Sequence, residues 1–114
     1  MNSKKDKLWT GIPIEMVKRK LWRFNFGVRD FHFVPGMDFD LMVTGKDQTE
    51  LVSITTERPD RIPRKCSVVA WVEKSGKITF VVKSKGQLLE FKSPYKVFGQ
   101  PKNKGRALQN NKLT

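Results

Sequence analysis

The stretch that decides the fold is SVVAWVEKSGKITFVVKSKGQLLEF, residues 67–91. Apolar residues recur at every second position, as they do along β-strands, and the pairs Ser75-Gly76 and Lys85-Gly86 interrupt them at the spacing of hairpin turns. Two-residue turns here predict three antiparallel strands, and a slip of one residue would turn the apolar side chains to the other face. The predicted register pairs Trp71 with Phe80, Val69 with Val82, Val82 with Leu89, and Phe80 with Phe91. It places on one continuous face Val69, Trp71, Ile78, Phe80, Val82, Leu89 and Phe91.

The residues before this stretch predict further strands. A four-residue loop at 46–49 pairs Val43 with Val52 and Leu41 with Ile54, so that both strands share an apolar face. An alternation of aromatic and apolar residues indicates another strand at about 22–28, with members Trp22, Phe24, Phe26 and Val28. The chain is therefore predicted to be mainly β over about 22–92: a small, strongly bent antiparallel meander or barrel of SH3-like or OB-like kind.

One short amphipathic helix is expected at about 11–21. Thr10 offers a capping hydroxyl, and Pro13 is tolerated in a first helical turn. One helical face carries the apolar residues Ile14, Val17 and Leu21. The helix is one candidate to cover the second apolar face of strand 67–74, whose members are Val68, Ala70 and Val72. The other candidate is closure of a barrel by the strand at 22–28.

The length of 114 residues predicts a single domain at 10–98. It is expected to lie between a flexible basic arm at 1–9 and a basic disordered tail at 99–114. No apolar run approaches the roughly 20 residues of a membrane span, and no signal peptide is visible. With Cys66 as the single cysteine, an internal disulfide is excluded, and the expected compartment is the cytoplasm.

Charge gives the strongest indication of function. The formal net charge is +12, and residues 1–23 and 95–114 each contribute +5 to it, whereas residues 24–94 contribute +2. Basic segments on both sides of a nearly neutral centre are typical of proteins that contact phosphates. We therefore expect a nucleic-acid-binding protein of little sequence specificity, with DNA and RNA both open. The alternative is a small basic module, an inhibitor or adaptor, that docks on an acidic protein.

The expected phosphate contacts come from three segments: the end of the helix, a proline-stiffened loop at 56–65, and the residues after the last strand. They are Lys18, Arg19, Lys20, Arg23, Arg58, Arg61, Arg64, Lys65 and Lys96. Arginine guanidinium groups bind phosphate in a bidentate way, which makes the loop the preferred contact.

Sequence motifs for catalysis are sparse. His32 is the only histidine, and it lies between Phe31 and Phe33, where strand spacing points it outward as a surface residue. One Cys and one His cannot complete a zinc site, and Asp38 with Asp40 are read as solvated charges. No phosphate-binding glycine loop or metalloprotease motif is present. The sequence therefore predicts a protein that is not an enzyme and that needs no cofactor or metal.

Overall fold

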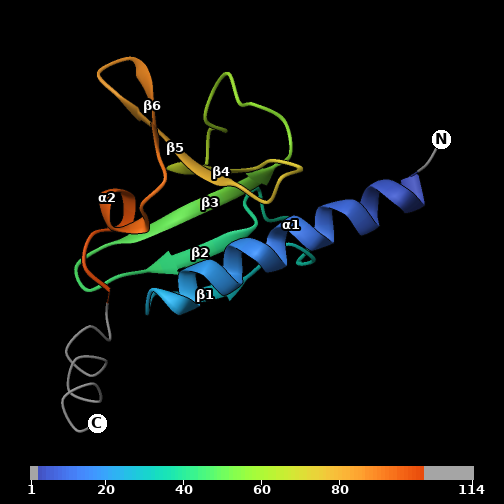
Figure 1. Cartoon of the computed structure of the whole chain (residues 1–114), viewed down its shortest axis with the longest axis horizontal. Coiled ribbons are helices and arrows are strands. Elements are labelled where there is room, and N and C mark those ends of the chain that lie inside the picture. Colours follow the sequence, from blue (N-terminus) through green and yellow to red (C-terminus); the bar gives the residue numbers. More distant parts are fainter. Residues whose placement is uncertain (1–2, 102–114) are drawn as a thin grey trace, which may run out of the picture.

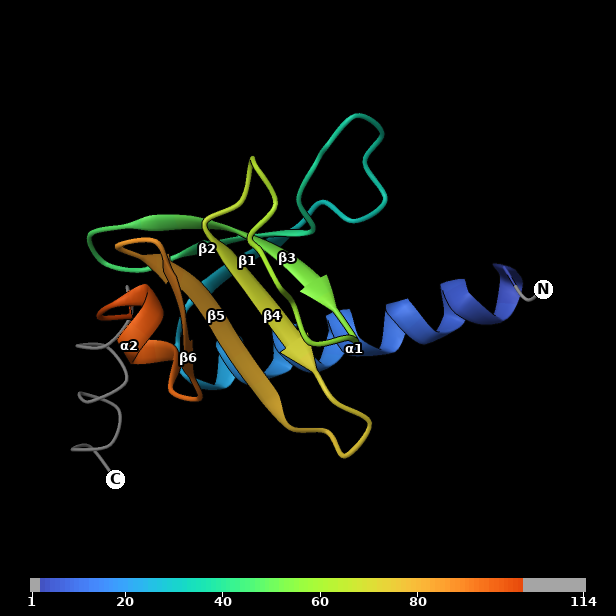
Figure 2. The ribbon, with the colours of Figure 1, turned by 90° about the horizontal axis from the view of Figure 1, so that it is seen from above.

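The structure is a computed structural model that describes residues 3–101, with side chains from Ile12 onward. Its elements are α1 (Ser3–Arg23), β1 (Gly27–Asp30), β2 (Leu41–Thr44), β3 (Thr49–Thr55), β4 (Val68–Val72), β5 (Ile78–Ser84), β6 (Gln87–Phe91) and α2 (Pro94–Phe98). The six strands form one sheet in the order β1-β2-β3-β4-β5-β6 (Figures 1 and 2). The prediction of a mainly β domain is confirmed.

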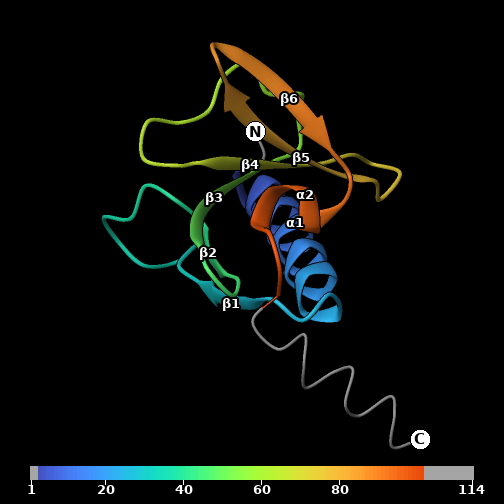
Figure 3. The ribbon, with the colours of Figure 1, turned by 90° about the vertical axis from the view of Figure 1, so that its left-hand side faces the viewer.

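The sheet is strongly bent and wraps around α1, which lies with α2 against its concave face (Figure 3). Among the described strands, β1 pairs only with β2 and β6 only with β5, so the sheet has two open edges. It is not a closed barrel, and the alternative in which a strand at about 22–28 closes a barrel is wrong, since α1 runs to Arg23 and β1 spans Gly27–Asp30. The cover of the concave face is instead the helix.

The helix α1 is longer than the predicted 11–21, because it begins at Ser3 and runs through Pro13. A proline inside a helix costs about 3 kcal/mol but does not forbid it. The stretch expected as a flexible arm is thus helical from Ser3 onward, and residues 1–2 lie outside the described part. The helix ends where Asn25 adopts a φ of 70°.

Strand register follows the type of each hairpin turn. The β5–β6 register is the predicted one, with Phe80 opposite Phe91 and Val82 opposite Leu89. In β4–β5, Trp71 instead lies opposite Thr79, because the turn has three residues, 74–76, and Glu73 and Lys77 close it. This difference of one residue moves Trp71 away from Phe80 to the outer face. The expected pairing of these two residues is therefore wrong.

The two remaining junctions also differ from a simple meander. In β2–β3, Leu41 lies opposite Val52, a shift of two residues from the prediction that preserves the apolar face. β3 and β4 pair in parallel, with Val52 beside Val68, where an antiparallel pairing was expected. The loop of residues 56–67 makes this crossover.

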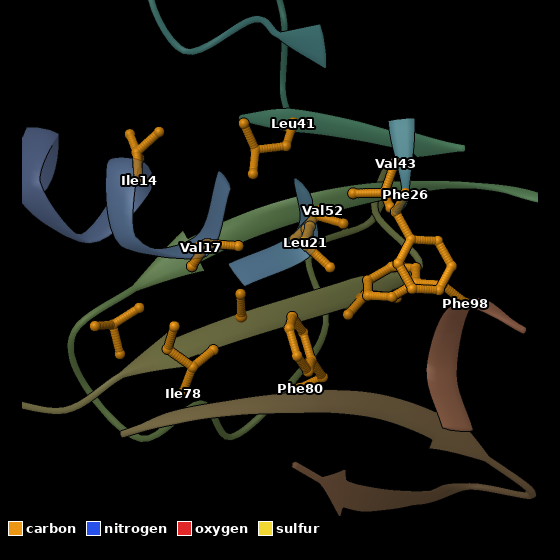
Figure 4. Close-up of a cluster of buried hydrophobic side chains, with 13 residues drawn as sticks. Ile14, Val17, Leu21, Phe26, Leu41, Val43, Val52, Ile78, Phe80 and Phe98 are labelled. Carbon is orange, nitrogen blue, oxygen red and sulfur yellow. The ribbon is translucent and has the colours of Figure 1, made fainter. Parts of the chain in front are cut away.

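The core lies between α1, α2 and the concave face of the sheet (Figure 4). The helix contributes Ile14, Val17 and Leu21, the apolar face that the sequence predicted. The strands, the segment between α1 and β1, and α2 complete the cluster with Phe26, Leu41, Val43, Val52, Val68, Ala70, Val72, Ile78, Phe80 and Phe98. In the part of the chain that the structure describes, no helix is long and apolar enough to cross a membrane.

Candidate functional site

Polar side chains gather where the loop of residues 31–40, between β1 and β2, returns to the sheet. The Phe31 N–H donates to the carbonyl of Asp40 at 2.8 Å, and the Asp40 N–H donates to the carbonyl of Val52 at 2.9 Å. At the other end of the loop, the His32 N–H donates to the Asp30 carboxylate at 2.9 Å. These contacts fix both ends of the loop and bring His32 beside Asp40.

His32 and Asp40 form a hydrogen-bonded dyad. The ring Nδ1 lies 2.8 Å from one carboxylate oxygen of Asp40, and the other oxygen accepts the N–H of Ile54 at 2.7 Å. The side chains are 25% and 21% exposed, so the dyad is partly enclosed but reachable from solvent. A carboxylate at Nδ1 selects the tautomer that carries the proton there, which leaves Nε2 as a proton acceptor. The arrangement can therefore accept a proton from a bound water.

A pocket of about 130 Å³ adjoins the dyad. It lies between α1, the loop of residues 31–40 and the end of β3. Its lining residues are Pro13, Ile14, His32, Asp40, Ile54, Thr55 and Thr56. Pockets for whole ligands usually measure about 300–1,000 Å³, so this one suits a water molecule and a small oxyanion rather than a nucleoside.

A second polar cluster borders the dyad through Asp30. The Lys18 ammonium lies 3.0 Å from Asp30 and 3.0 Å from Glu15. The hydrogen bond from Lys18 to Asp30, followed by the one to Glu15, raises the pKa of Lys18. Burial acts to raise the pKa of Asp30, but the His32 N–H and the Lys18 ammonium together outweigh it, and that pKa is lowered. The cluster therefore ties α1 to the end of β1 as ion pairs.

Cys66 lies on the other side of Asp40. Its thiol donates to the carbonyl of Asp38 at 3.6 Å. Burial first, and then the negative charges of Asp40 and Asp38, raise the pKa of the thiol. Among the described residues, no group of three or more His, Cys, Asp or Glu side chains is placed to hold a metal ion.

The predicted helix bases occupy different environments. Lys18 is engaged by Glu15 and Asp30 and lies 5.4 Å from the centre of the Trp22 ring. Lys20 lies 5.9 Å from the centre of the Phe24 ring. Arg19 and Arg23 are exposed.

The predicted loop bases belong to the loop of residues 56–67, which projects outward from the bent sheet, whereas α1 lies within the sheet (Figure 3). Arg58 pairs with Glu90 at 2.7 Å, and Lys65 lies 3.5 Å from Asp38. Arg61 and Arg64 are exposed, as is Lys96 on α2.

His32 and Asp40 are the candidate residues that sequence reasoning missed as a pair. They are eight residues apart, and the loop between them has no regular structure. The one available signal was that the only histidine stands close in sequence to two aspartates, Asp38 and Asp40.

Comparison with known proteins gives one informative result. No family model matches the chain, and no curated protein matches it. Among solved structures, it is similar to a bacterial homing endonuclease, I-Ssp6803I, with a TM-score of 0.52 over 95% of this chain and 96% of that one. The two sequences are 13% identical, so the likeness concerns the fold.

This likeness corrects the expectation that the chain is not an enzyme, because the fold is one that an endonuclease adopts. That expectation rested on the scarcity of short catalytic motifs. A pocket lined by residues of α1, the loop of residues 31–40 and the end of β3 leaves no such motif in the sequence.

Proposed function

We propose that this protein binds DNA and hydrolyses phosphodiester bonds at the His32–Asp40 dyad. Three independent features support the proposal: the net charge of +12, a fold similar to that of an endonuclease, and a pocket beside a histidine held by a carboxylate. The dyad is the observation that carries the enzymatic part. The alternative partner, an acidic protein, has no feature of the structure in its favour.

The dyad supplies a general base in the proposed reaction. His32 Nε2 takes a proton from a water in the pocket, and the resulting hydroxide forms a bond to phosphorus as the bond to the leaving oxygen breaks. The leaving oxygen then takes a proton from solvent or from the imidazolium. Asp40 acts as a positioning residue, because its carboxylate holds the ring and stabilises the imidazolium that forms.

The basic residues hold the strand against this site in the proposal. Arg61 and Arg64 are exposed and form no ion pair among the described residues, whereas Arg58 and Lys65 each pair with an acid, so Arg61 and Arg64 are the loop residues most available to phosphate. The helix bases Arg19, Lys20 and Arg23 add contacts on another part of the surface, with Lys96, Lys18, Arg58 and Lys65 as further members of the predicted set. Because each neutralised phosphate releases counterion, the logarithm of affinity should fall with that of salt by about 0.9 per contact on a duplex.

The test measures binding and cleavage separately. Supercoiled plasmid and a labelled duplex are incubated with wild type, His32→Gln and Asp38→Asn, with Mg²⁺ or with EDTA. General-base catalysis contributes about 10²–10⁴-fold, so His32→Gln should lose at least about 100-fold in nicking rate and keep its duplex affinity. Asp38→Asn is the matched control, because its exposed carboxylate is 3.5 Å from Lys65 and outside the dyad.

The outcomes separate the two parts of the proposal. Equal nicking rates of wild type and His32→Gln would show that the dyad takes no part in the mechanism. Duplex binding by wild type without nicking under any condition would refute the proposed hydrolysis and support DNA binding alone. Failure of wild type to bind the duplex at physiological salt would refute the proposed function.

A further inference from the structure

The outer face of the sheet carries a second hollow, distant in sequence from the dyad. It measures about 360 Å³ and lies over β4, β5 and β6, on the face opposite to α1. Trp71 and Thr79, which are paired across β4–β5, both face this side of the sheet. The hollow, here called the outer cradle, is lined by Arg58, Trp71, Glu73, Lys77, Thr79, Glu90 and Lys92.

Two lysines line the cradle where β5 begins and β6 ends. Lys77 precedes β5 and Lys92 follows β6, and both side chains line the same hollow. The hydrogen-bonding and charge interaction with Lys77 lowers the pKa of Lys92. Glu73 lies 3.8 Å from Lys77, and its charge also acts to raise the pKa of Lys92, so this one acid faces both lysines. No acid of the described residues forms an ion pair with Lys92. Two lysines that share one acid leave this part of the hollow with a net positive charge, which favours an anion.

The other end of the cradle is a flat aromatic and cationic surface. The Arg58 guanidinium lies 5.4 Å from the centre of the Trp71 ring, and Glu90 holds it there through a contact of 2.7 Å. Aromatic rings and arginine planes are the surfaces on which unpaired bases stack, at about 1–3 kcal/mol per base. The Glu90 contact fixes the guanidinium before any ligand arrives.

From this juxtaposition we infer that the outer cradle binds one nucleotide of a single-stranded nucleic acid. The phosphate lies between Lys77 and Lys92, and the base lies against Arg58 and Trp71. A duplex offers phosphates to the lysines but no free base face to Trp71, so the cradle distinguishes single strands from duplexes. The inference rests on the proposed function for the identity of the polymer and adds a strand-selective site outside the dyad.

The experiment uses two matched charge-removal variants of the whole chain. Lys77→Gln/Lys92→Gln alters the cradle end of the β5–β6 hairpin, and Lys83→Gln/Lys85→Gln removes the same charge at the opposite, exposed end. An eight-residue thymidine single strand and a duplex of mixed sequence are the probes. Tryptophan emission is read in a Trp9→Phe/Trp22→Phe background, in which Trp71 is the single indole.

The cradle variant should bind the single strand at least about tenfold more weakly, and the slope of log affinity against log salt should flatten by about 1.4 for two lost contacts. The control pair should change single-strand affinity less than threefold. The single strand should quench Trp71 emission, and the duplex should not.

If both double variants weaken single-strand binding equally, net charge alone explains the effect, and the proposed nucleotide site in the cradle is refuted. Single-strand binding that leaves Trp71 emission unchanged would refute it as well. Duplex binding by wild type without single-strand binding would overturn the inference and leave the proposed function standing. Binding to neither probe would refute both.

Discussion

Phe80 is the residue that joins the sheet to the C-terminal helix. Its side chain is fully buried, and its ring lies 5.3 Å from that of Phe98, edge to face. We predict that Phe80→Ala destabilises the fold by about 3–5 kcal/mol, the usual cost of removing a buried aromatic side chain. Trp71→Ala should cost clearly less, because Trp71 lies on the partly exposed outer face. Urea unfolding of the two variants checks the order, and the reverse order would place Trp71 in the core.

The pKa of the Cys66 thiol depends in part on the charge of Asp40. Since burial and then the carboxylates of Asp40 and Asp38 raise the pKa of the thiol above its usual 9.0, iodoacetamide should alkylate folded protein slowly at neutral pH. Asp40→Asn removes one of these charges, so the midpoint of the pH profile for alkylation should move down. Asp60→Asn serves as the control for net charge, and an equal shift in both variants would show that Asp40 has no local effect on the thiol.

At the scale of elements, the Lys18–Asp30 ion pair connects α1 to β1 and should make stability depend on pH. The pKa of Asp30 is lowered from 3.8 on folding, so its contribution is present above 3.8 and is lost as pH falls through the folded value. The pKa of Lys18 is raised from 10.5, so its contribution is present below 10.5 and is lost as pH rises through the folded value.

The corresponding prediction uses Asp30→Asn. Partly exposed ion pairs contribute about 0.2–1 kcal/mol, so the variant should lose about that much at pH 6 and match wild type more closely near pH 2. Chemical denaturation at both pH values measures the difference. Asp47→Asn removes an exposed carboxylate that has no ion pair among the described residues. If Asp47→Asn loses the same free energy of unfolding at pH 6, the effect of Asp30→Asn is due to net charge and not to the ion pair.

The local turn chemistry explains which strand pairings the sequence predicted. Lys85 and Gly86 both have positive φ, 51° and 82°, which is the two-residue hairpin turn that places Phe80 opposite Phe91. At the preceding turn Gly76 alone has positive φ, 94°, and it ends a three-residue loop. The sequence Ser75-Gly76 is compatible with both loop lengths, so the register of Trp71 could not be read from it.

The parallel pairing and the candidate site depend on tertiary contacts and were beyond sequence reasoning. Nothing in the composition of residues 56–67 distinguishes a crossover from a hairpin loop. His32 meets Asp40 because Asp40 is fixed to β3 through Val52 and Ile54. The buried helix face of Ile14, Val17 and Leu21, in contrast, follows from 3.6-residue periodicity alone and was predicted.

At the scale of the whole molecule, residues 99–101 close the fold onto the β2–β3 turn. Pro101 is buried and forms a bridge with Gly45, and the Lys46 N–H donates to the carbonyl of Gln100 at 2.8 Å. A Cβ on Gly45 would lie 2.8 Å from the carbonyl oxygens of Phe98 and Gln100, so glycine permits this close approach. The basic disordered tail was expected at 99–114; its residues 102–114 lie outside the described part of the chain, and there the tail stays a prediction.

Two truncations test this closure. A chain ending at Pro101 should melt within about 2 °C of wild type, whereas a chain ending at Gly99 loses about 1 kcal/mol per hydrogen bond and should melt about 4–8 °C lower. Both truncated chains lack the four bases of residues 102–114, so duplex affinity should fall in both. Calorimetry and a binding titration measure the two effects. Equal melting temperatures of the two truncated chains would show that the contacts of residues 100–101 do not contribute to the stability of the fold.

The parallel ladder between β3 and β4 has a consequence for how fast the chain folds. It divides the sheet into two blocks, α1 to β3 and β4 to α2, whose other strand pairings are all between neighbours in sequence. Hairpins form in about 1–10 μs, but the parallel ladder contributes no stabilising contacts until the loop of residues 56–67 has closed. Docking of the two blocks is therefore the slow step. Doubling the length of that loop would add about 0.6 kcal/mol of closure entropy and slow folding about threefold, with every native contact of the sheet retained.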